Sequence, residues 1–311
     1  KTRNLPDSHE KIQNYLTIGI GLKDLSHQVP EDYALTFTQA ADSFREAVRT
    51  AKAMGDWKHE SYGWGFLGEL YEEEGRHAEA LRLTQMAIRA SQQGQAPEAL
   101  YRWEWNTGRN LKNLGRMDDA ILAYQRAMDT LQPIRQELVL GLPHSPASFR
   151  ESVGALFFET ADLLLQRADE VTDATKREEL LFQTRDTIEA LKTAELQDYF
   201  KDDCVEANQN RIQAIDKVSG TTAIIYPILF PDRMAVLMSL GGTIRKITVP
   251  VQESALTEKI HLFRTLLEKR TTHQYLPHAQ SLYDLLIQPL EPHLNEFGVQ
   301  TLVFVPDGPL R

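Results

Sequence analysis

The sequence predicts an all-helical repeat domain over residues 1–217 and an α/β domain over residues 218–311. Four small residues in the helical part recur at an offset of 40 positions, a regularity that indicates a repeat architecture. They are Gly68, Gly75, Ala80 and Ala87, which return as Gly108, Gly115, Ala120 and Ala127. After Thr221 the spacing of apolar residues changes from about 3.6, the period of a helix, to 2, the period of a strand.

The helical domain begins with two predicted helices that differ from the later copies, as the terminal units of repeat proteins do. Apolar residues at helical spacing predict the first over 10–25. A second helix is predicted to begin at Pro30, because proline suits the first helical turn and acidic residues there meet the helix dipole. Gly55 is predicted to end it.

Residues 61–94 and 101–134 are the best copies of the repeat, and each predicts two antiparallel helices. The first copy contains Trp64, Leu67, Gly68, Tyr71, Gly75, Ala80 and Ala87. These residues stand at the signature positions of a tetratricopeptide repeat, which the copy resembles. The offset of 40 exceeds the usual repeat length of about 34, and the excess is predicted at SQQGQAPEA, where Gly94 and Pro97 indicate a loop.

After Ile134 the repeat goes out of phase. The segment GLPHSPASF predicts a loop, and apolar residues at helical spacing predict two longer helices over about 147–170 and 174–198. We interpret 147–198 as a degenerate further repeat that closes a tetratricopeptide-type superhelix. The single cysteine, Cys204, lies in the segment that leads out of this domain.

Three β-rich runs predict an antiparallel meander over about 222–250, with Gly241-Gly242 as one of the turns. Pro227 predicts that the first strand is an edge strand, because a central strand needs every backbone donor.

Two helices are predicted next, over about 253–270 and 276–297. The last apolar run, TLVFV, predicts a strand at about 301–306 that is buried on both faces, as in a parallel sheet covered by helices.

Three segments of the second part of the chain are informative: TIEALKTAELQDYFKDDCV, LIQPLEPHL and especially TLVFVPDGPLR. They resemble the CHAT family, caspase-like domains that are related to separase and occur beside tetratricopeptide repeats. The resemblance implies the first part of a caspase-like α/β domain, with an antiparallel meander, two helices and one core strand. It also implies a cysteine peptidase whose His–Cys dyad lies on later strands, beyond Arg311. We therefore expect this chain to hydrolyse nothing, and the missing C-terminal CHAT segment is an expected partner that would cover the last strand.

The residues present give no catalytic centre of their own. Cys204 follows two acidic residues, whereas a nucleophilic thiolate needs a nearby base or a positive field. No histidine has the sequence spacing of a metal-binding motif, and His273 and His278 are interpreted as surface or capping residues. The glycines form no phosphate-binding loop. We expect no catalytic residue, no metal and no cofactor.

The formal net charge of −10 is confined to the helical part, because residues 219–311 contain eight basic and eight acidic side chains. An acidic surface disfavours nucleic acid, whose affinity depends on basic side chains that meet phosphates. No apolar run reaches the length of a membrane span, and a single cysteine suits a reducing compartment. We expect a cytoplasmic protein without a nucleic-acid or membrane partner.

The candidate site is the inner wall of the predicted superhelix, formed by the first helix of each hairpin. Basic and aromatic residues of the second copy follow at spacings of three, four and three, which places them on one helical face. Together with equivalent positions of the first copy, the predicted peptide-binding residues are Tyr62, Glu69, Arg102, Trp105, Arg109 and Lys112. Such a stripe could hold an acidic peptide through charge-assisted hydrogen bonds and stacking. Alternatively, Glu69 or Glu72 pairs with Arg109 or Lys112 between neighbouring helices and binds nothing else.

Two functional hypotheses follow. In the first, the chain is the recognition and regulatory half of a caspase-like cysteine peptidase, and its repeats bind a protein partner that controls cleavage. In the second, it is a scaffold whose repeats bind protein and whose caspase-like part is inert. A histidine and a cysteine on later strands would favour the first.

Overall fold

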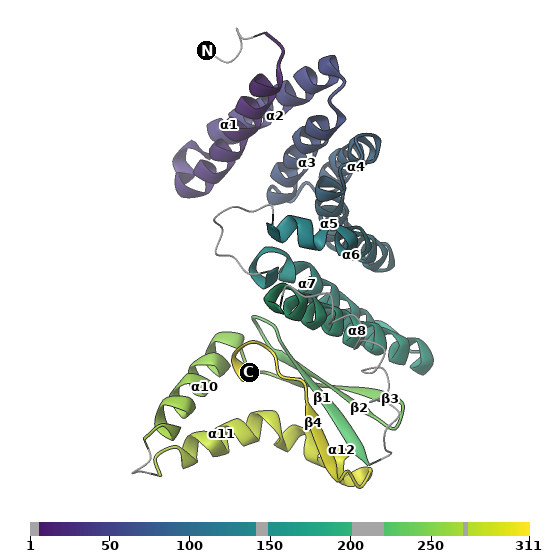
Figure 1. Ribbon diagram of the computed structural model, residues 1–311, viewed down its shortest axis with the longest axis vertical. Helices are drawn as coiled ribbons and strands as arrows, with labels where there is room; N and C mark the ends of the chain where they lie inside the picture. Colours follow the sequence, from purple (N-terminus) through teal and green to yellow (C-terminus); the bar gives the residue numbers. More distant parts are fainter. Residues whose placement is uncertain (1–5, 141–148, 201–220, 270–272) are drawn as a thin grey trace. The chain divides into compact units, whose positions relative to one another are not determined.

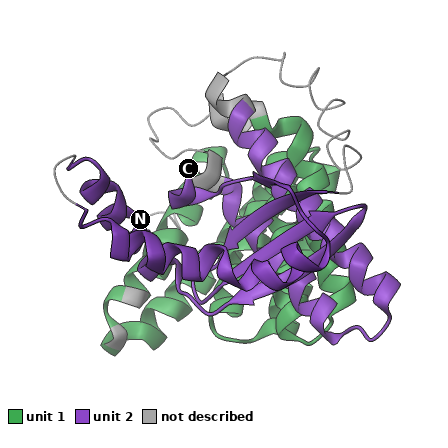
Figure 2. Ribbon diagram, turned by 90° about the horizontal axis from the view of Figure 1, so that it is seen from below, with its two compact units in different colours: residues 1–147 green, residues 148–311 purple. Residues whose placement is uncertain are grey.

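The computed structural model describes residues 6–140, 149–200, 221–269 and 273–311. The described residues are mostly helical, and adjacent helices pack in pairs. They form two compact units, residues 1–147 and 148–311 (Figure 2). The predicted domain boundary after residue 217 and the residue Cys204 lie outside the described residues.

Unit 1 consists of three antiparallel helix pairs, as the repeat pattern predicts (Figure 1). The pairs are α1 (His9–Gln28) with α2 (Tyr33–Met54), α3 (Trp57–Glu73) with α4 (His77–Gln93), and α5 (Pro97–Asn113) with α6 (Met117–Leu140). A short 3₁₀ turn, η2 (Pro30–Asp32), precedes α2. Gly55 ends α2 in the left-handed conformation, with φ of 69°. The first residues of α3 and α5, and those of α4 and α6, are 40 positions apart, so the offset in the sequence is the offset between repeats.

The connection between the two best repeats is shorter than predicted. Helix α4 ends at Gln93 and α5 begins at Pro97, so the extra residues lengthen helices rather than a loop. Gly94 lies against the start of α3, where an added Cβ would be 3.0 Å from Trp57 Cβ and from the Lys58 nitrogen. A small residue therefore suits this close approach.

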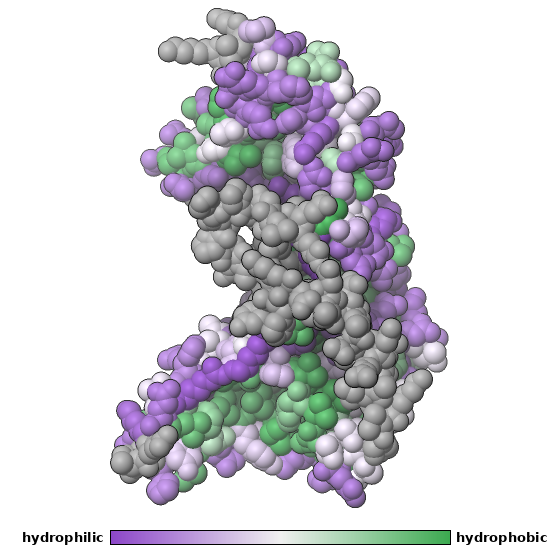
Figure 3. All heavy atoms as spheres, viewed as in Figure 1, coloured by the Kyte–Doolittle hydropathy of each residue, from purple (hydrophilic) through white to green (hydrophobic). Residues whose placement is uncertain are grey.

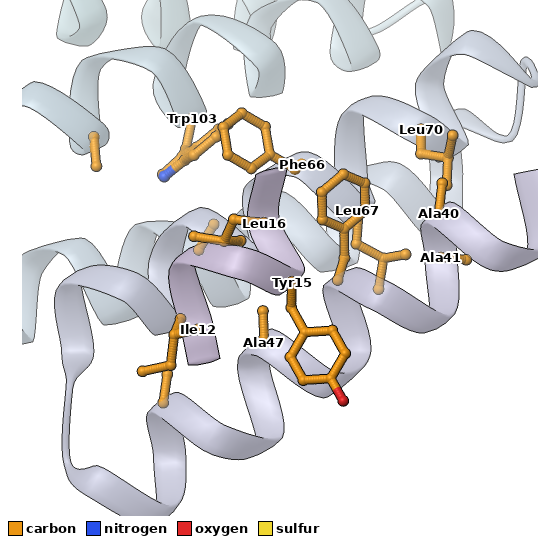
Figure 4. Packing of buried hydrophobic residues seen from close by; sticks show 14 of the residues in the cluster. Ile12, Tyr15, Leu16, Ala40, Ala41, Ala47, Phe66, Leu67, Leu70 and Trp103 are labelled. Atoms are coloured by element: carbon orange, nitrogen blue, oxygen red, sulfur yellow. The ribbon is translucent and has the colours of Figure 1, made fainter. Parts of the chain in front are cut away.

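The core of unit 1 is built where small residues face aromatic rings (Figure 4). Trp103 of α5 is fully buried and meets Phe66 of α3 edge-on, with ring centres 5.6 Å apart. A Cβ on Gly65 would lie 2.3 Å from three atoms of the Trp103 ring, and a Cβ on Gly108 would lie 2.7 Å from Tyr124. These glycines therefore leave the space that the rings fill, which is the physical reason for part of the small-residue pattern.

Unit 2 begins with the helix pair α7 (Phe149–Glu170) and α8 (Ala174–Phe200). Most of the predicted GLPHSPASF loop before α7, residues 141–148, lies outside the described residues.

A four-stranded mixed sheet follows. The strands are β1 (Thr222–Leu229), β2 (Met234–Leu240), β3 (Thr243–Val249) and β4 (Thr301–Phe304), in the order β3-β2-β1-β4. The first three form the predicted antiparallel meander, and β4 pairs with β1 in parallel. Gly241 and Gly242 have φ of 58° and 83°, the positive values that a two-residue hairpin turn requires.

The prediction that β1 is an edge strand is wrong, because β1 lies between β2 and β4. Pro227 is tolerated there since β4 is short. The pairing with β4 covers Thr222 to Ile225 of β1, and the last hydrogen bond runs from the Val305 nitrogen to the Ile225 oxygen. Position 227 lies beyond the end of β4, so the proline removes no donor from that ladder.

The predicted helix over 276–297 is also corrected, because the segment is broken. Its pieces are α11 (Leu276–Leu286), η5 (Gln288–Leu290) and α12 (Glu291–Glu296), and they follow α10 (Glu253–Leu267). Pro289 and Pro292 stand at the starts of the last two pieces, and a proline lacks the N–H that a continuing helix needs.

Strand β4 is parallel, as predicted, and it is partly uncovered in this chain, as expected of a strand that a further segment would cover. Leu302 and Phe304 are 38% and 42% exposed, because β4 is the last strand of the sheet among the described residues. On the side of unit 2 that Figure 3 shows, hydrophobic residues gather in the area of β4 and α10.

The interior of the sheet is buried on both faces, and every residue of β2 is buried. One face packs against α10, α11 and η5 through Leu256, Ile260, Leu282 and Leu290. Helix α8 contacts β3, and the pair α7–α8 lies on the opposite side of the sheet (Figure 1). No helix among the described residues combines the length and the apolar character that crossing a membrane requires.

Candidate binding groove

Side chains of α3 and α5 form charge pairs between consecutive repeats. Arg109 contacts Glu72 with two guanidinium nitrogens: Nε lies 2.6 Å from Oε1 and Nη2 lies 3.3 Å from Oε2. Arg102 Nη2 lies 3.5 Å from Oε1 of Glu69. Glu69 and Glu72 are three positions apart on α3, so both carboxylates lie on the same helical face toward α5.

A third cation comes from α1. Lys23 Nζ lies 3.1 Å from Oε1 of Glu73 and 3.5 Å from Oε2 of Glu69. Burial disfavours the charged ammonium group, but the two carboxylates outweigh that effect and raise the pKa of Lys23. Lys23 is therefore positively charged at neutral pH and offsets the negative charge of α3.

Two buried asparagines of α5 fix the carboxylates further. Asn106 Nδ2 donates to Oε1 of Glu69 over 3.2 Å, and Asn110 Nδ2 donates to Oε2 of Glu72 over 3.4 Å. Nδ1 of His77, the first residue of α4, lies 3.1 Å from Oδ1 of Asn110. The charged row is thus part of a hydrogen-bonded network that reaches into the protein.

An open groove of about 510 Å³ lies beside this network. Its walls come from α1, α3, α5 and the start of α4. The lining residues are Lys23, Glu69, Glu72, Glu73, His77, Arg109 and Asn113. Charges of both signs face the groove, so it suits a polar, charged ligand better than an apolar one.

The predicted site residues are distributed over this region unevenly. Glu69 and Arg109 line the groove. Tyr62 is half-buried and belongs with the core, because its ring stacks on Phe66 at 5.9 Å and meets Trp103 edge-on at 6.0 Å.

The remaining three residues lie on α5 and are not among the residues that line the groove. Arg102 is 39% exposed and contacts Glu69. The Arg109 guanidinium carbon lies 5.2 Å from the centre of the Trp105 ring, a cation–π contact. Lys112 is half-buried and follows Arg109 by three positions. The pairing of Glu72 with Arg109, which the sequence left open, is therefore present together with an open groove.

Sequence reasoning missed the contribution of the first helix. Lys23 comes 46 positions before Glu69, in a segment that does not follow the repeat pattern, so no spacing rule connects the two. His77 was missed as well, although it occupies the first position of a repeat helix.

The turn after β4, which belongs to the segment that resembles CHAT domains, is anchored to α8. Lys192 Nζ donates to the Pro306 oxygen over 2.6 Å and lies 3.5 Å from Oδ1 of Asp307. Burial lowers the pKa of Lys192, partly offset by the Asp307 carboxylate. The Leu310 nitrogen donates to the Asp307 oxygen over 3.0 Å and closes the turn. Asp307 is thus a buried turn residue.

Comparison with known proteins does not identify a family for this chain. No family model matches this chain. No curated protein matches it. Among solved structures, BtubC (BKLC) from P. vanneervenii is similar over 67% of this chain and 91% of its own, with 17% sequence identity and a TM-score of 0.37. At that TM-score the likeness identifies neither a common fold nor a function.

Proposed function

We propose that this chain is a recognition module in which the groove of unit 1 binds an extended segment of a partner protein. The observation that supports this most directly is the groove of about 510 Å³ with charged side chains from three repeats at its walls. A site that combines residues of α1, α3 and α5 can contact several positions of an extended ligand at the same time. Repeat proteins use their concave surfaces in this way.

We propose an acidic segment as the ligand, because the arginines are the more accessible members of their ion pairs. Arg102 and Arg109 are 39% and 29% exposed, whereas Glu69 and Glu72 are 16% and 14% exposed. A guanidinium group carries five N–H donors, so it can bridge an internal carboxylate and a carboxylate of the ligand. The neighbouring Lys23 reduces the repulsion that the glutamates would exert on such a ligand.

Fluorescence-anisotropy titration of the full chain would test the proposal, with three labelled octapeptides as probes: one of mixed Asp and Glu around a single Tyr, one with Lys and Arg in the same positions, and one with Ser. We expect the acidic peptide to bind most tightly, with an affinity that falls as salt is added. The double variant Arg109→Glu, Lys112→Glu should abolish that binding while the helical content measured by circular dichroism stays the same.

Arg49→Glu is a matched control, because Arg49 lies on α2, is 57% exposed and takes no part in the groove. It should leave binding unchanged. If the basic or the serine peptide binds as tightly as the acidic one, or if the double variant binds normally, the acidic-segment proposal is wrong.

We further propose, from the sequence resemblance, that unit 2 contains the first part of a CHAT-type domain and that partner binding controls a cysteine peptidase. The order of the meander, the helices, the parallel strand and the buried PDG turn supports this assignment. The alternative is a scaffold with an inert caspase-like part. The coding sequence after Arg311 distinguishes them, because a peptidase requires a histidine and a cysteine there. Peptidase activity of the longer product, lost on replacement of that cysteine by alanine, would support the first hypothesis.

A further inference from the structure

Two histidines and an aspartate converge where α1 meets the turn between α2 and α3. Nδ1 of His9 lies 2.8 Å from Oδ2 of Asp56, and Nδ1 of His59 lies 2.6 Å from the same oxygen. One ligand atom of each residue lies within 4.8 Å of the other two. Among the described residues, this is the one group of three His, Cys, Asp or Glu side chains that is close enough to hold a metal ion.

The two oxygens of Asp56 have different tasks. Oδ1 accepts a hydrogen bond from the His59 nitrogen over 3.1 Å and caps the first turn of α3. Oδ2 faces the two imidazole rings. Oδ2 is thus the oxygen available to a metal ion, which carboxylates bind in their ionised form.

The second ring nitrogen of His59 contacts Gln13. Nε2 of His59 lies 2.7 Å from the side-chain amide nitrogen of Gln13, which is one helical turn along α1 from His9. The amide nitrogen donates, so in this arrangement Nε2 accepts and Nδ1 carries the proton that points to Asp56. With a metal at Nδ1 the ring proton would move to Nε2, and the Gln13 amide would have to turn so that its oxygen accepts it, the arrangement that orients metal-bound histidines.

We propose that His9, Asp56 and His59 bind a divalent transition-metal ion of the zinc type. Imidazole nitrogen and carboxylate oxygen are ligands that zinc accepts, and three protein ligands leave the fourth tetrahedral position to water. Zinc bonds of about 2.0–2.2 Å place the ligand atoms about 3.3 Å apart. The present separations of 2.6 and 2.8 Å therefore need to widen by roughly half an ångström.

Side-chain rotation can supply that movement. The His9 side chain is 69% exposed and free to swing, while Asp56 and His59 are 11% and 18% exposed and form the preorganised part of the site. Bound metal would join the first turn of α1 to the first turn of α3 and fix the first helix on its neighbours. The site lies away from the groove residues, so it adds a function to the proposed recognition module.

The test is isothermal titration calorimetry of the full chain, without a histidine tag and after chelator treatment, with ZnCl2 as the probe. We expect one high-affinity site per chain and a higher thermal midpoint in the presence of zinc. Co²⁺ should give the visible absorption of a tetrahedral nitrogen–oxygen site. His59→Gln and Asp56→Asn should each weaken zinc binding at least tenfold. Asn keeps the helix cap, so Asp56→Asn separates the loss of the ligand charge from the loss of the fold.

His261→Gln provides the control, since His261 is an exposed histidine of α10 outside the cluster. It should bind zinc like the unchanged chain. Gln13→Ala should weaken binding by about 10–100-fold, the usual effect of removing such a supporting partner. Absence of a stoichiometric zinc site, or equal affinity in the unchanged chain and in His59→Gln and Asp56→Asn variants that keep their helical content, would overturn the proposal.

Discussion

Gly65 is where the packing of the repeats can be tested most sharply. We predict that Gly65→Ala destabilises unit 1, because the added Cβ would lie 2.3 Å from three atoms of the Trp103 ring. Ordinary contacts of this kind are about 3.5–4.0 Å long, so the ring must move by more than 1 Å. Trp103 is fully buried, and its ring contacts the rings of Phe66 and Tyr62.

The magnitude follows from a comparison with Gly21→Ala. Gly21 lies inside α1, and a Cβ there meets nothing within 4 Å. Both substitutions gain the helix propensity of alanine over glycine, about 1 kcal/mol. That gain cancels in the difference, which leaves the overpacking cost of about 1–3 kcal/mol, with the upper end expected for an immobile ring. Gly21→Ala should therefore be stabilising, and Gly65→Ala should be less stable than Gly21→Ala by up to about 3 kcal/mol.

Urea denaturation followed by tryptophan fluorescence measures this difference. All four tryptophans, Trp57, Trp64, Trp103 and Trp105, lie in unit 1, so the signal reports on that unit alone. The denaturation midpoint should fall for Gly65→Ala and rise for Gly21→Ala, with the denaturant slope unchanged. If Gly65→Ala is as stable as Gly21→Ala, the close packing of α3 on the Trp103 ring is not the reason for this glycine.

Three shorter predictions concern other buried or exposed groups. Burial raises the pKa of Glu104 above its ordinary value of 4.5 in spite of the hydrogen bond from Thr130. The ionised carboxylate therefore destabilises the folded state at neutral pH. Glu104→Gln should raise the urea midpoint at pH 7, and the gain should shrink as the pH falls toward 4.5 because the folded chain then gains from protonating Glu104. Lys192→Met should accelerate amide hydrogen exchange in residues 305–311, since it removes the bond to the turn after β4. Phe304→Lys at the exposed edge should change the thermal midpoint little, whereas Ile225→Lys in the paired, buried position of β1 should lower it strongly or prevent folding.

The repeat region was predictable because its signals are local and reinforce one another. Small residues at a fixed offset gave the helix pairs, although Pro97, which was expected in a loop, is the first residue of α5 and has the place that proline favours in the first helical turn. The turn at Gly241 and Gly242 gave the hairpin for a similar reason, because few other residues adopt two successive positive φ values.

The errors arise where a residue depends on partners that are distant in the sequence. Pro227 predicted an edge strand. A proline is tolerated at this position of a central strand because β4, some 75 residues later, is too short to pair with it. The groove had the same difficulty, since Lys23 joins Glu69 and Glu73 only after the first helix has packed. Neither fact is visible in a local pattern.

The apolar pattern of residues 149–200 was assigned to a helical hairpin, but it also contains a signal for further packing partners. Leu163, Leu164 and Leu165 of α7 are consecutive and all at most 1% exposed. Consecutive helical residues are about 100° apart, so three of them span about 200°, just over half of the helix circumference. Such a helix must be covered on more than one side, unlike an ordinary surface helix with one apolar stripe. Helix α8 packs along it, and Asp162 pairs with Arg233 at the turn between β1 and β2. The run of three leucines therefore already indicated that this helix pair has neighbours beyond the single partner of a helical hairpin.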